Sequence, residues 1–185
     1  MKRAVFLDRD GTLIEEVGYL DRFEQIRVFP YAVDAVRMLN RAGFAVVVAT
    51  NQSGVARGYF DEAFVSAVHQ RLDRTFADAG ARIEGFYHCP HHPEGPMPAY
   101  QRVCECRKPR PGLLRRAASD LDLDLARSFV VGDRANDIEA GRAVGAAGVL
   151  VLTGYGTSVE ADARSAARAV TSNLIEAVSW ILRQS

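Results

Sequence analysis

"RAVFLDRDGT" (residues 3–12) contains the first strand that the sequence predicts. A short apolar run ends at Asp8, and Asp10 and Gly11 follow directly. A run of this length, bounded by charged and glycine residues, is typical of a buried strand. In an open α/β sheet, ligands bind beyond the carboxyl ends of the strands. The stretch therefore predicts a strand that delivers two carboxylates to a ligand site.

Strand-like and helix-like segments alternate along the rest of the chain. "FAVVVATN" (44–51) is a β-branched run typical of a strand buried on both faces of a parallel sheet. Further strands are expected at 83–89, 128–133 and 148–154, and helices at 31–43, 61–80, 111–121, 135–145 and 172–184. This alternation predicts a doubly wound α/β fold with a mostly parallel sheet and helices on both faces. The length predicts one domain over residues 1–185.

Composition excludes several classes of partner. Lys+Arg and Asp+Glu both number 23, and this zero net charge argues against a sequence-independent grip on nucleic acid. No stretch is long enough for a membrane span, and the charged N-terminus does not resemble a signal peptide. The three cysteines lie close together and are odd in number, so they do not suggest a disulfide framework. We expect a cytoplasmic protein with no membrane partner, and a monomer.

Polar side chains also follow the later strands. They are Thr50-Asn51-Gln52-Ser53-Gly54 after the second strand, Gly132-Asp133-Arg134 after the fourth, Asp137 one turn later, and Lys108 before the third crossover helix. The carboxyl ends of parallel strands meet at one edge of a sheet. Carboxylates, a lysine, and hydroxyl or amide donors are therefore expected to converge on one crevice.

The carboxylates predict a bound metal ion and catalysis through a covalent enzyme intermediate. Asp8, Asp10 and Asp133 would repel one another, so a hard cation such as Mg²⁺ is expected among them. Asp8 can attack phosphorus and form an aspartyl-phosphate. Asp10 can protonate the leaving oxygen and later activate the hydrolytic water. These residues predict phosphoryl transfer through an enzyme-bound intermediate.

The remaining polar residues are expected to bind the phosphoryl group. Thr50, Asn51 and nearby backbone N–H groups can hold its oxygens. Lys108 can neutralise charge on both the nucleophile and the phosphate. Asp8, Asp10, Thr50 and Lys108 are therefore the candidate catalytic residues.

A proline-rich loop at about 89–107 gathers the metal-binding side chains. Its ligand pairs are Cys89-x-His91 and Cys104-x-Cys106, separated by twelve residues. Three thiolates and one imidazole form a closed set typical of structural Zn²⁺. His88 and His92 compete with His91, which is favoured because Cys-x-His spacing lets two side chains of an extended segment reach one point. The alternative is three unligated thiols in a flexible loop.

Four motifs together resemble those of the haloacid dehalogenase (HAD) phosphatase superfamily. They are "DRDGT" (8–12), "TNQSG" (50–54), the lysine of "CRKP" (Lys108) and "GDRAND" (132–137). Each motif alone is weak, but four in this order at successive strand ends form a specific pattern. The resemblance implies a HAD-like Rossmannoid fold. A catalytically silent, zinc-stabilised binding module is the rival interpretation, and it would require Asp8 or Lys108 to be replaced.

Superfamily members often carry a large cap domain after the first or second motif. Only about 40 residues separate Asp10 from Thr50, and these must supply a turn, the stretch 14–30 and a helix. We therefore expect no large cap domain. The site should be covered by loops at 14–30, 52–60 and 90–108.

The cysteine loop narrows the resemblance from the superfamily to two of its phosphatase families. The pattern C-x-H…C-x-C-R-K-P, with "NQSGVARG" (51–58) and "GYL" (18–20), is similar to the D-glycero-D-manno-heptose-1,7-bisphosphate 7-phosphatases. Bacterial histidinol-phosphatases share the zinc loop. "SGVARGYF" (53–60) favours the heptose family, whereas "GDRANDI" (132–138) looks as much like the histidinol enzymes. The expected substrate is a small phosphorylated sugar of nucleotide-activated heptose biosynthesis, with histidinol phosphate as the alternative.

The resemblance also implies roles for single residues. Mg²⁺ would be held by the Asp8 carboxylate, the backbone carbonyl of Asp10, and Asp133. Substrate contacts would come from Glu16, Val17, Gly18, Tyr19, Thr50, Asn51, Gln52, Ser53, Arg107, Lys108 and Arg134, with the two arginines reaching a second phosphate. Arg57 is either a further phosphate contact or a solvated charge. Asp137 either supports the site or is an acid in the first turn of a helix.

Overall fold

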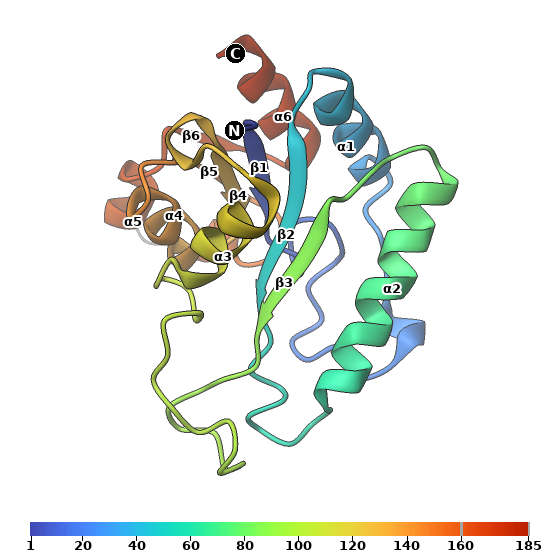
Figure 1. Ribbon diagram of the computed structural model, residues 1–185, viewed down its shortest axis with the longest axis vertical. Coiled ribbons are helices and arrows are strands. Elements are labelled where there is room, and N and C mark those ends of the chain that lie inside the picture. The colour runs from blue at the N-terminus through green and yellow to red at the C-terminus, as the bar shows by residue number, and fades with distance from the viewer. Residues whose placement is uncertain (160, 185) are drawn as a thin grey trace.

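The computed structural model describes residues 1–159 and 161–184 (Figure 1). Six strands form one sheet in the order β3-β2-β1-β4-β5-β6, and every neighbouring pair is parallel. The strands are β1 (Ala4–Leu7), β2 (Ala45–Asn51), β3 (Gly85–Cys89), β4 (Phe129–Gly132), β5 (Ala147–Val151) and β6 (Ala169–Thr171). The predicted α/β fold is confirmed. Strand β6 was not predicted, because three residues at a sheet edge carry no periodic pattern.

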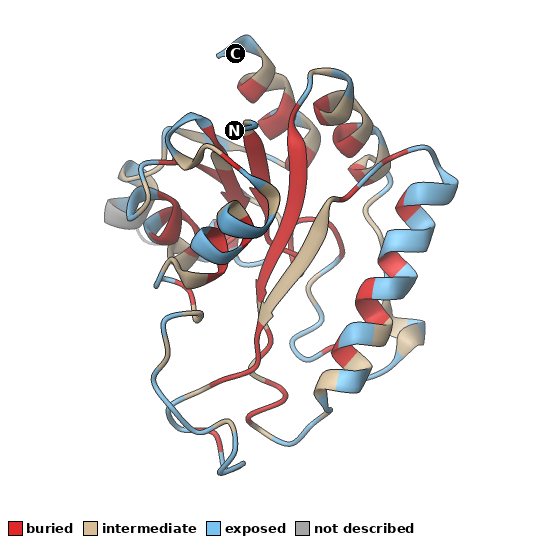
Figure 2. Ribbon diagram, in the orientation of Figure 1, coloured by how far each residue is buried: buried red, intermediate tan, exposed pale blue. Residues whose placement is uncertain are grey.

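Helices cover both faces of this sheet. On one face lie α1 (Ala32–Arg41), α2 (Glu62–Asp78) and α6 (Leu174–Arg183), and on the other α3 (Gly112–Leu121) and α4 (Ala135–Arg142), with the short α5 (Ala161–Ser165) against α4. Val5 and Leu7 of β1 pack into the first core, and Ala4 and Phe6 pack into the second. The central strands are therefore buried on both sides (Figure 2), which explains their continuous apolar runs.

Strand order brings the predicted site together. The chain runs from β1 outward to β2 and β3, then crosses to β4 on the other side of β1. The register pairs Leu7 with both Val48 and Val131, so β1 and β4 end almost level while β2 continues past them to Asn51. Loops leaving β1 and β4 diverge at this switch point and open a crevice between them. Asp8 and Asp133 consequently meet at its floor, although 124 residues lie between them.

Loops extend beyond this end of the sheet. The connection from β1 to α1 contains one 3-10 turn (Phe23–Gln25), and the long segment after β3 lies at the bottom of Figure 1. This segment packs on the loop after β2, because Met97 N–H donates to the Ala56 carbonyl at 3.1 Å. A methyl group at Gly95 would lie 2.6 Å from the Ala56 Cβ, so glycine is needed there for the close approach.

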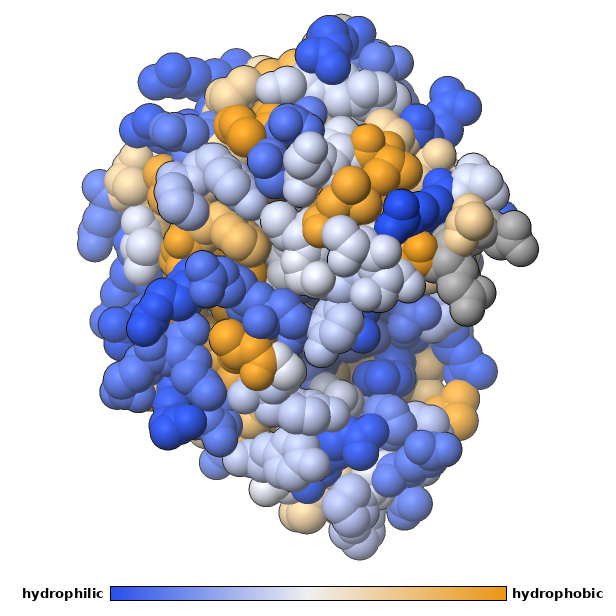
Figure 3. All heavy atoms as spheres, turned by 180° about the vertical axis from the view of Figure 1, so that it is seen from behind, coloured by the Kyte–Doolittle hydropathy of each residue, from blue (hydrophilic) through white to orange (hydrophobic). Residues whose placement is uncertain are grey.

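The described surface is mixed in polarity. The face in Figure 3 carries its apolar side chains in separate patches with hydrophilic surface between them. In the described part of the chain, no helix combines the length and apolarity needed to cross a bilayer.

Candidate functional site

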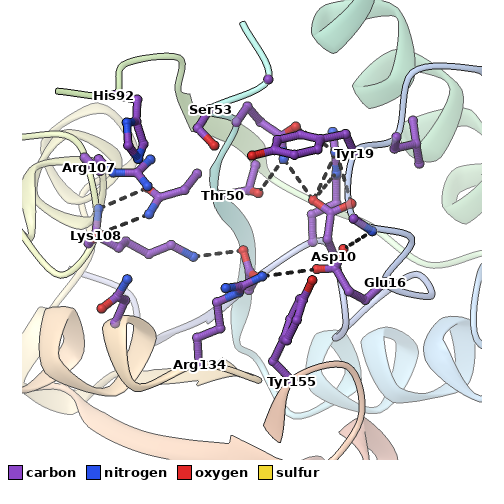
Figure 4. A pocket seen from close by; sticks show the side chains of 18 of the residues that line it. Asp10, Glu16, Tyr19, Thr50, Ser53, His92, Arg107, Lys108, Arg134 and Tyr155 are labelled. Atoms are coloured by element: carbon purple, nitrogen blue, oxygen red, sulfur yellow. Dashed lines mark hydrogen bonds and ion pairs between the residues drawn. The ribbon is translucent and has the colours of Figure 1, made fainter. Parts of the chain in front are cut away.

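A cavity of about 350 Å³ opens at the carboxyl ends of β1 and β2 (Figure 4). Most of the predicted site residues line it: Asp8, Asp10, Glu16, Gly18, Tyr19, Thr50, Asn51, Gln52, Ser53, Arg107, Lys108 and Arg134. Two do not. Val17 is exposed and faces a separate hollow with Arg22, and Asp133 is fully buried beside Asp8.

Lys108 is the charged centre of the cavity floor and is only 4% exposed. Its Nζ lies 2.8 Å from Asp8 Oδ1 and 2.5 Å from Asp137 Oδ1, and it donates to the Ala49 carbonyl at 2.7 Å. Burial alone would lower the pKa of Lys108, but the carboxylates of Asp137 and Asp8 outweigh it and raise that pKa. Lys108 therefore stays cationic, and Asp137 supports it.

Asn51 fixes the backbone that carries Lys108. Asn51 Nδ2 donates to the Lys108 carbonyl at 3.0 Å, and Lys108 N–H donates back to Asn51 Oδ1 at 3.0 Å. Asn51 is also in register with Cys89, the last residue of β3. The side chain expected to hold phosphoryl oxygens therefore also positions the lysine, and it lies next to the cysteine loop.

Two buried carboxylates on the floor resist ionisation. Burial raises the pKa of Asp8 to about 6, with Asp137 and Asp10 adding to the shift and Lys108 opposing it. Burial and then the charge of Asp8 raise the pKa of Asp133 to about 8. Asp133 Oδ2 accepts from Tyr155 N–H at 2.7 Å, whereas its buried Oδ1 has no hydrogen-bond partner among the described residues.

These residues fit a hard divalent cation. Carboxylate oxygens of Asp8, Asp133 and Asp137 all lie within 4.8 Å of one another. A methyl group at Gly11 or Gly154 would lie 2.3 or 2.2 Å from Asp133 Oδ2, so glycines keep this oxygen clear of side chains. The other oxygen, Asp133 Oδ1, has no hydrogen-bond partner among the described residues and lies among repelling carboxylates. A cation with oxygen ligands satisfies such a set of donors.

The predicted zinc ligands also converge. Cys89 Sγ, His91 Nδ1, Cys104 Sγ and Cys106 Sγ lie within 4.8 Å of one another, with 3.1 Å between Cys89 and Cys106 and 3.5 Å between Cys89 and Cys104. Two sulfurs of a tetrahedral zinc site are separated by roughly 3.8 Å. His88 instead lies 3.9 Å from Glu62, and His92 lines the cavity. Of the three histidines, His91 completes the cluster.

Comparison with known proteins shows the family to which the chain belongs. A family model described as "HAD-hyrolase-like" matches residues 105–177. A D-glycero-beta-D-manno-heptose-1,7-bisphosphate 7-phosphatase of Salmonella typhi is 41% identical over 98% of this chain and 96% of its own. A D-glycero-D-manno-heptose-1,7-bisphosphate 7-phosphatase of Thermosynechococcus vestitus is 45% identical over 96% of this chain and 94% of its own. The chain belongs to the heptose-bisphosphate phosphatase family of HAD-like hydrolases.

Solved structures of this family agree with the fold. The D,D-heptose 1.7-bisphosphate phosphatase from B. bronchiseptica, solved with magnesium and phosphate, superposes with a TM-score of 0.83 at 32% identity over 99% of both chains. The enzyme from Burkholderia thailandensis gives a TM-score of 0.67 at 31% identity over 98% of this chain and 99% of its own. As a member of this family, the chain is a phosphoric monoester hydrolase, and the non-enzymatic alternative is set aside.

Arginines also line the phosphatase cavity: Arg107 lies on the same side as Lys108, and Arg134 lies near Tyr155 and Glu16 (Figure 4). The Arg134 guanidinium lies 3.8 Å above the Tyr155 ring and 3.6 Å from Glu16. Arg107 Nη1 donates to the His91 carbonyl at 3.2 Å, which ties it to the cysteine loop. Arg57 also lines the cavity, and its buried Nε has no hydrogen-bond partner in the part of the chain that the structure describes.

Several cavity residues of this phosphatase were missed by sequence reasoning. Tyr155 comes from the loop after β5 and His92 from the cysteine loop, and neither stands in a motif. Arg9 is different, because it lies between the two aspartates of the first motif and is almost fully buried. A long charged side chain directly after a buried strand requires partners, and that was the available signal.

Proposed function

We propose that this phosphatase removes the 7-phosphate of D-glycero-D-manno-heptose 1,7-bisphosphate, in the biosynthesis of nucleotide-activated heptose for lipopolysaccharide core or S-layer glycan. The observation that carries the proposal is the Asp8–Lys108 pair at the floor of a cavity whose other walls carry Arg107 and Arg134. A bisphosphate needs cations beyond those at the reacting phosphorus, and arginine can grip phosphate with two parallel bonds. The names of the relatives support the same substrate.

The reaction starts at Asp8. With a pKa of about 6, its carboxylate is mostly ionised at neutral pH and can attack the 7-phosphorus. As the Asp8 Oδ–P bond forms, the bond from phosphorus to the sugar oxygen breaks, and Asp10 supplies the proton that this oxygen needs. Asp10 then takes a proton from water, whose oxygen attacks the phosphorus and releases phosphate and free Asp8.

Thr50 and Lys108 hold the transferring group. Gln52 Nε2 donates to Thr50 Oγ1 at 2.8 Å, so the threonine O–H remains available to donate to a phosphoryl oxygen. Lys108, fixed by Asn51 and Asp137, places its charge beside the nucleophile, where it can also contact that group. Fixed donors of this kind stabilise charge that develops during transfer without having to reorganise.

Mg²⁺ is the proposed catalytic cofactor. The Asp8 carboxylate, the Asp10 backbone carbonyl and Asp133 would hold it, and when bound it supplies positive charge beside the phosphoryl oxygens. The unpartnered Asp133 Oδ1 supports this assignment, as does the magnesium and phosphate in the B. bronchiseptica relative.

The raised pKa values predict how the stability of the metal-free protein depends on pH. A carboxyl whose pKa is higher in the folded state binds more protons when folded, so stability falls as pH rises between the two pKa values. From the raised pKa of Asp133, about 8 against an ordinary 3.8, chelator-treated protein should lose stability in urea between about pH 5 and pH 8. Mg²⁺ should remove most of this slope, and Asp133→Asn should flatten it without metal. A slope that neither change affects would contradict the proposed site.

Zn²⁺ is the proposed structural metal of the 89–107 loop. Cys89 ends β3, whereas Cys106 directly precedes Arg107 and Lys108. A metal joining these cysteines would fix the loop at both ends and set where the two cations stand. The reduced thiols that such a site requires fit the proposed cytoplasmic location.

A comparison of two substrates tests the proposed function. The wild-type enzyme should hydrolyse heptose 1,7-bisphosphate with kcat/KM at least about 100-fold above that for histidinol phosphate, because only the bisphosphate occupies both cationic regions. Arg107→Met should reduce the ratio of the two kcat/KM values, while Arg41→Met, at an exposed position of α1, should leave it unchanged. A preference for histidinol phosphate would reject the assignment.

A further inference from the structure

Arg9 is a cation that the proposed chemistry does not use, and it is only 2% exposed. A buried guanidinium is unfavourable unless it is paired and hydrogen-bonded. It directly follows the nucleophile in the sequence, but it forms no ion pair with Asp8 among the described contacts. Its actual partners show what Arg9 does.

Arg9 donates two hydrogen bonds to the carboxylate of Asp10. Arg9 Nε donates to Asp10 Oδ2 at 3.1 Å, and Arg9 Nη2 donates to Asp10 Oδ1 at 3.1 Å. Two parallel bonds of this kind fix the orientation of a carboxylate as well as its position. The plane of the Asp10 carboxylate is therefore set by Arg9.

Gln52 forms hydrogen bonds with both Arg9 and Asp10. Its Oε1 accepts from Arg9 Nη2 at 2.9 Å, which directs its Nε2 to Asp10 Oδ2 at 2.9 Å. Among the described residues, Asp10 Oδ2 thus accepts two hydrogen bonds and Oδ1 only one. Since each carboxylate oxygen has two acceptor positions, Oδ1 keeps one free. The Asp10 side chain is 18% exposed and lines the cavity.

His69 anchors the other side of the guanidinium. Arg9 Nη1 lies 3.4 Å from His69 Nε2, and because a guanidinium can only donate, the imidazole accepts through an unprotonated nitrogen. Burial and then the charge of Arg9 lower the pKa of His69 to about 3, consistent with a neutral ring. His69 belongs to α2 and stacks on Phe86 of β3, with 5.0 Å between ring centroids. Arg9 is therefore held by the packed fold rather than by a loop.

We propose that Arg9 is a positioning residue: with Gln52 and His69 it orients the Asp10 carboxylate so that Oδ1 meets the leaving oxygen of the substrate. The inference rests on the proposed role of Asp10. In the affected step the Asp10 proton moves to the ester oxygen while the bond from that oxygen to phosphorus breaks and the bond from Asp8 to phosphorus forms. Without Arg9, only the hydrogen bond from Gln52 holds the carboxylate, so its plane is no longer fixed and this proton transfer slows.

Leaving-group dependence tests the inference. The value of kcat/KM reports only the steps up to departure of the first product, so it isolates the acid role of Asp10. p-Nitrophenyl phosphate releases a stable phenolate that needs little help from an acid, whereas phenyl phosphate releases a more basic one. In Arg9→Met, the ratio of kcat/KM for p-nitrophenyl phosphate to that for phenyl phosphate should rise at least about 10-fold over wild type, a part of the effect of a general acid. Asp10→Asn should show the same rise.

Matched variants separate orientation from charge and from folding. Arg9→Lys keeps the charge but cannot form the two parallel bonds, so its ratio should also rise. His69→Phe keeps an aromatic ring at this position and removes the acceptor for Arg9, so a smaller rise is expected. Arg142→Met on exposed α4 surface should leave the ratio at the wild-type value. Urea unfolding establishes that each variant is folded.

The outcomes distinguish this inference from the proposed function. If the ratio rises in Asp10→Asn but stays at the wild-type value in folded Arg9→Met, Arg9 does not position Asp10, although Asp10 remains the acid. If Arg9→Met does not fold, an unchanged ratio in folded His69→Phe overturns the inference instead. An unchanged ratio in Asp10→Asn rejects the acid role of Asp10, and the role of Arg9 with it.

Discussion

Asp8→Asn is expected to abolish phosphatase activity, lowering kcat by at least about 10⁴-fold, the order seen when a catalytic nucleophile is removed. The amide is nearly the same size as the carboxylate but cannot form an acyl-phosphate. Lys108 retains its ion pair with Asp137, so the cavity floor should keep its shape. Steady-state kinetics with heptose 1,7-bisphosphate at saturating Mg²⁺ measures the loss.

The control for this variant must show that the fold survives. Asp73→Asn removes an equivalent charge from the exposed side of α2 and should leave both kcat and KM unchanged. Circular dichroism and urea unfolding of Asp8→Asn should show a folded, cooperative protein. Turnover comparable to wild type in Asp8→Asn would disprove the covalent mechanism.

Removing the proposed zinc is the second change with a large expected effect. Cys106→Ser takes away one of four converging ligands, two residues before Lys108. Structural zinc contributes about 10–16 kcal/mol to small zinc-finger peptides. In this protein Asn51 also holds the Lys108 backbone, so we expect a folded enzyme with a lower Tm and a kcat/KM reduced roughly 100-fold by misplacement of the catalytic cation.

Elemental analysis and metal restoration check this prediction. Wild-type protein should contain about one zinc atom per chain and Cys106→Ser far less. Val103→Ser, at a 65% exposed position of the same loop, should keep the metal, the Tm and the activity. After removal of all metals, Mg²⁺ alone should not restore wild-type activity, whereas Mg²⁺ with Zn²⁺ should. A zinc-free protein with full activity would refute a structural role for the metal.

Local sequence patterns were enough to predict the fold and the main site. Strands β1, β2 and β4 are apolar runs that end in polar residues, and a parallel α/β sheet brings such ends together. Asp8 and Lys108 could therefore be assigned to one crevice although they are 100 residues apart. The cysteine pairs were equally clear, because a closed metal site is determined by ligand type and short spacing.

The sequence did not give the partners of these residues. Asn51 lines the cavity as expected, but it was not predicted that its amide also holds the Lys108 backbone. Val17 was expected in the cavity, but the turn at Gly18 leaves it exposed outside. These placements depend on the path of individual loops, which carry no periodic pattern.

By itself, then, the sequence determined the parallel sheet, the carboxylates and lysine at its carboxyl edge, and the two cysteine pairs, because each is encoded by residue type at short spacing. Only the tertiary structure decided that Asp137 supports Lys108, that Asn51 holds the Lys108 backbone, and that Arg9 reaches Asp10 and His69. Contacts of this second kind depend on strand register and helix packing between segments as much as 60 residues apart, and no local spacing specifies such distances.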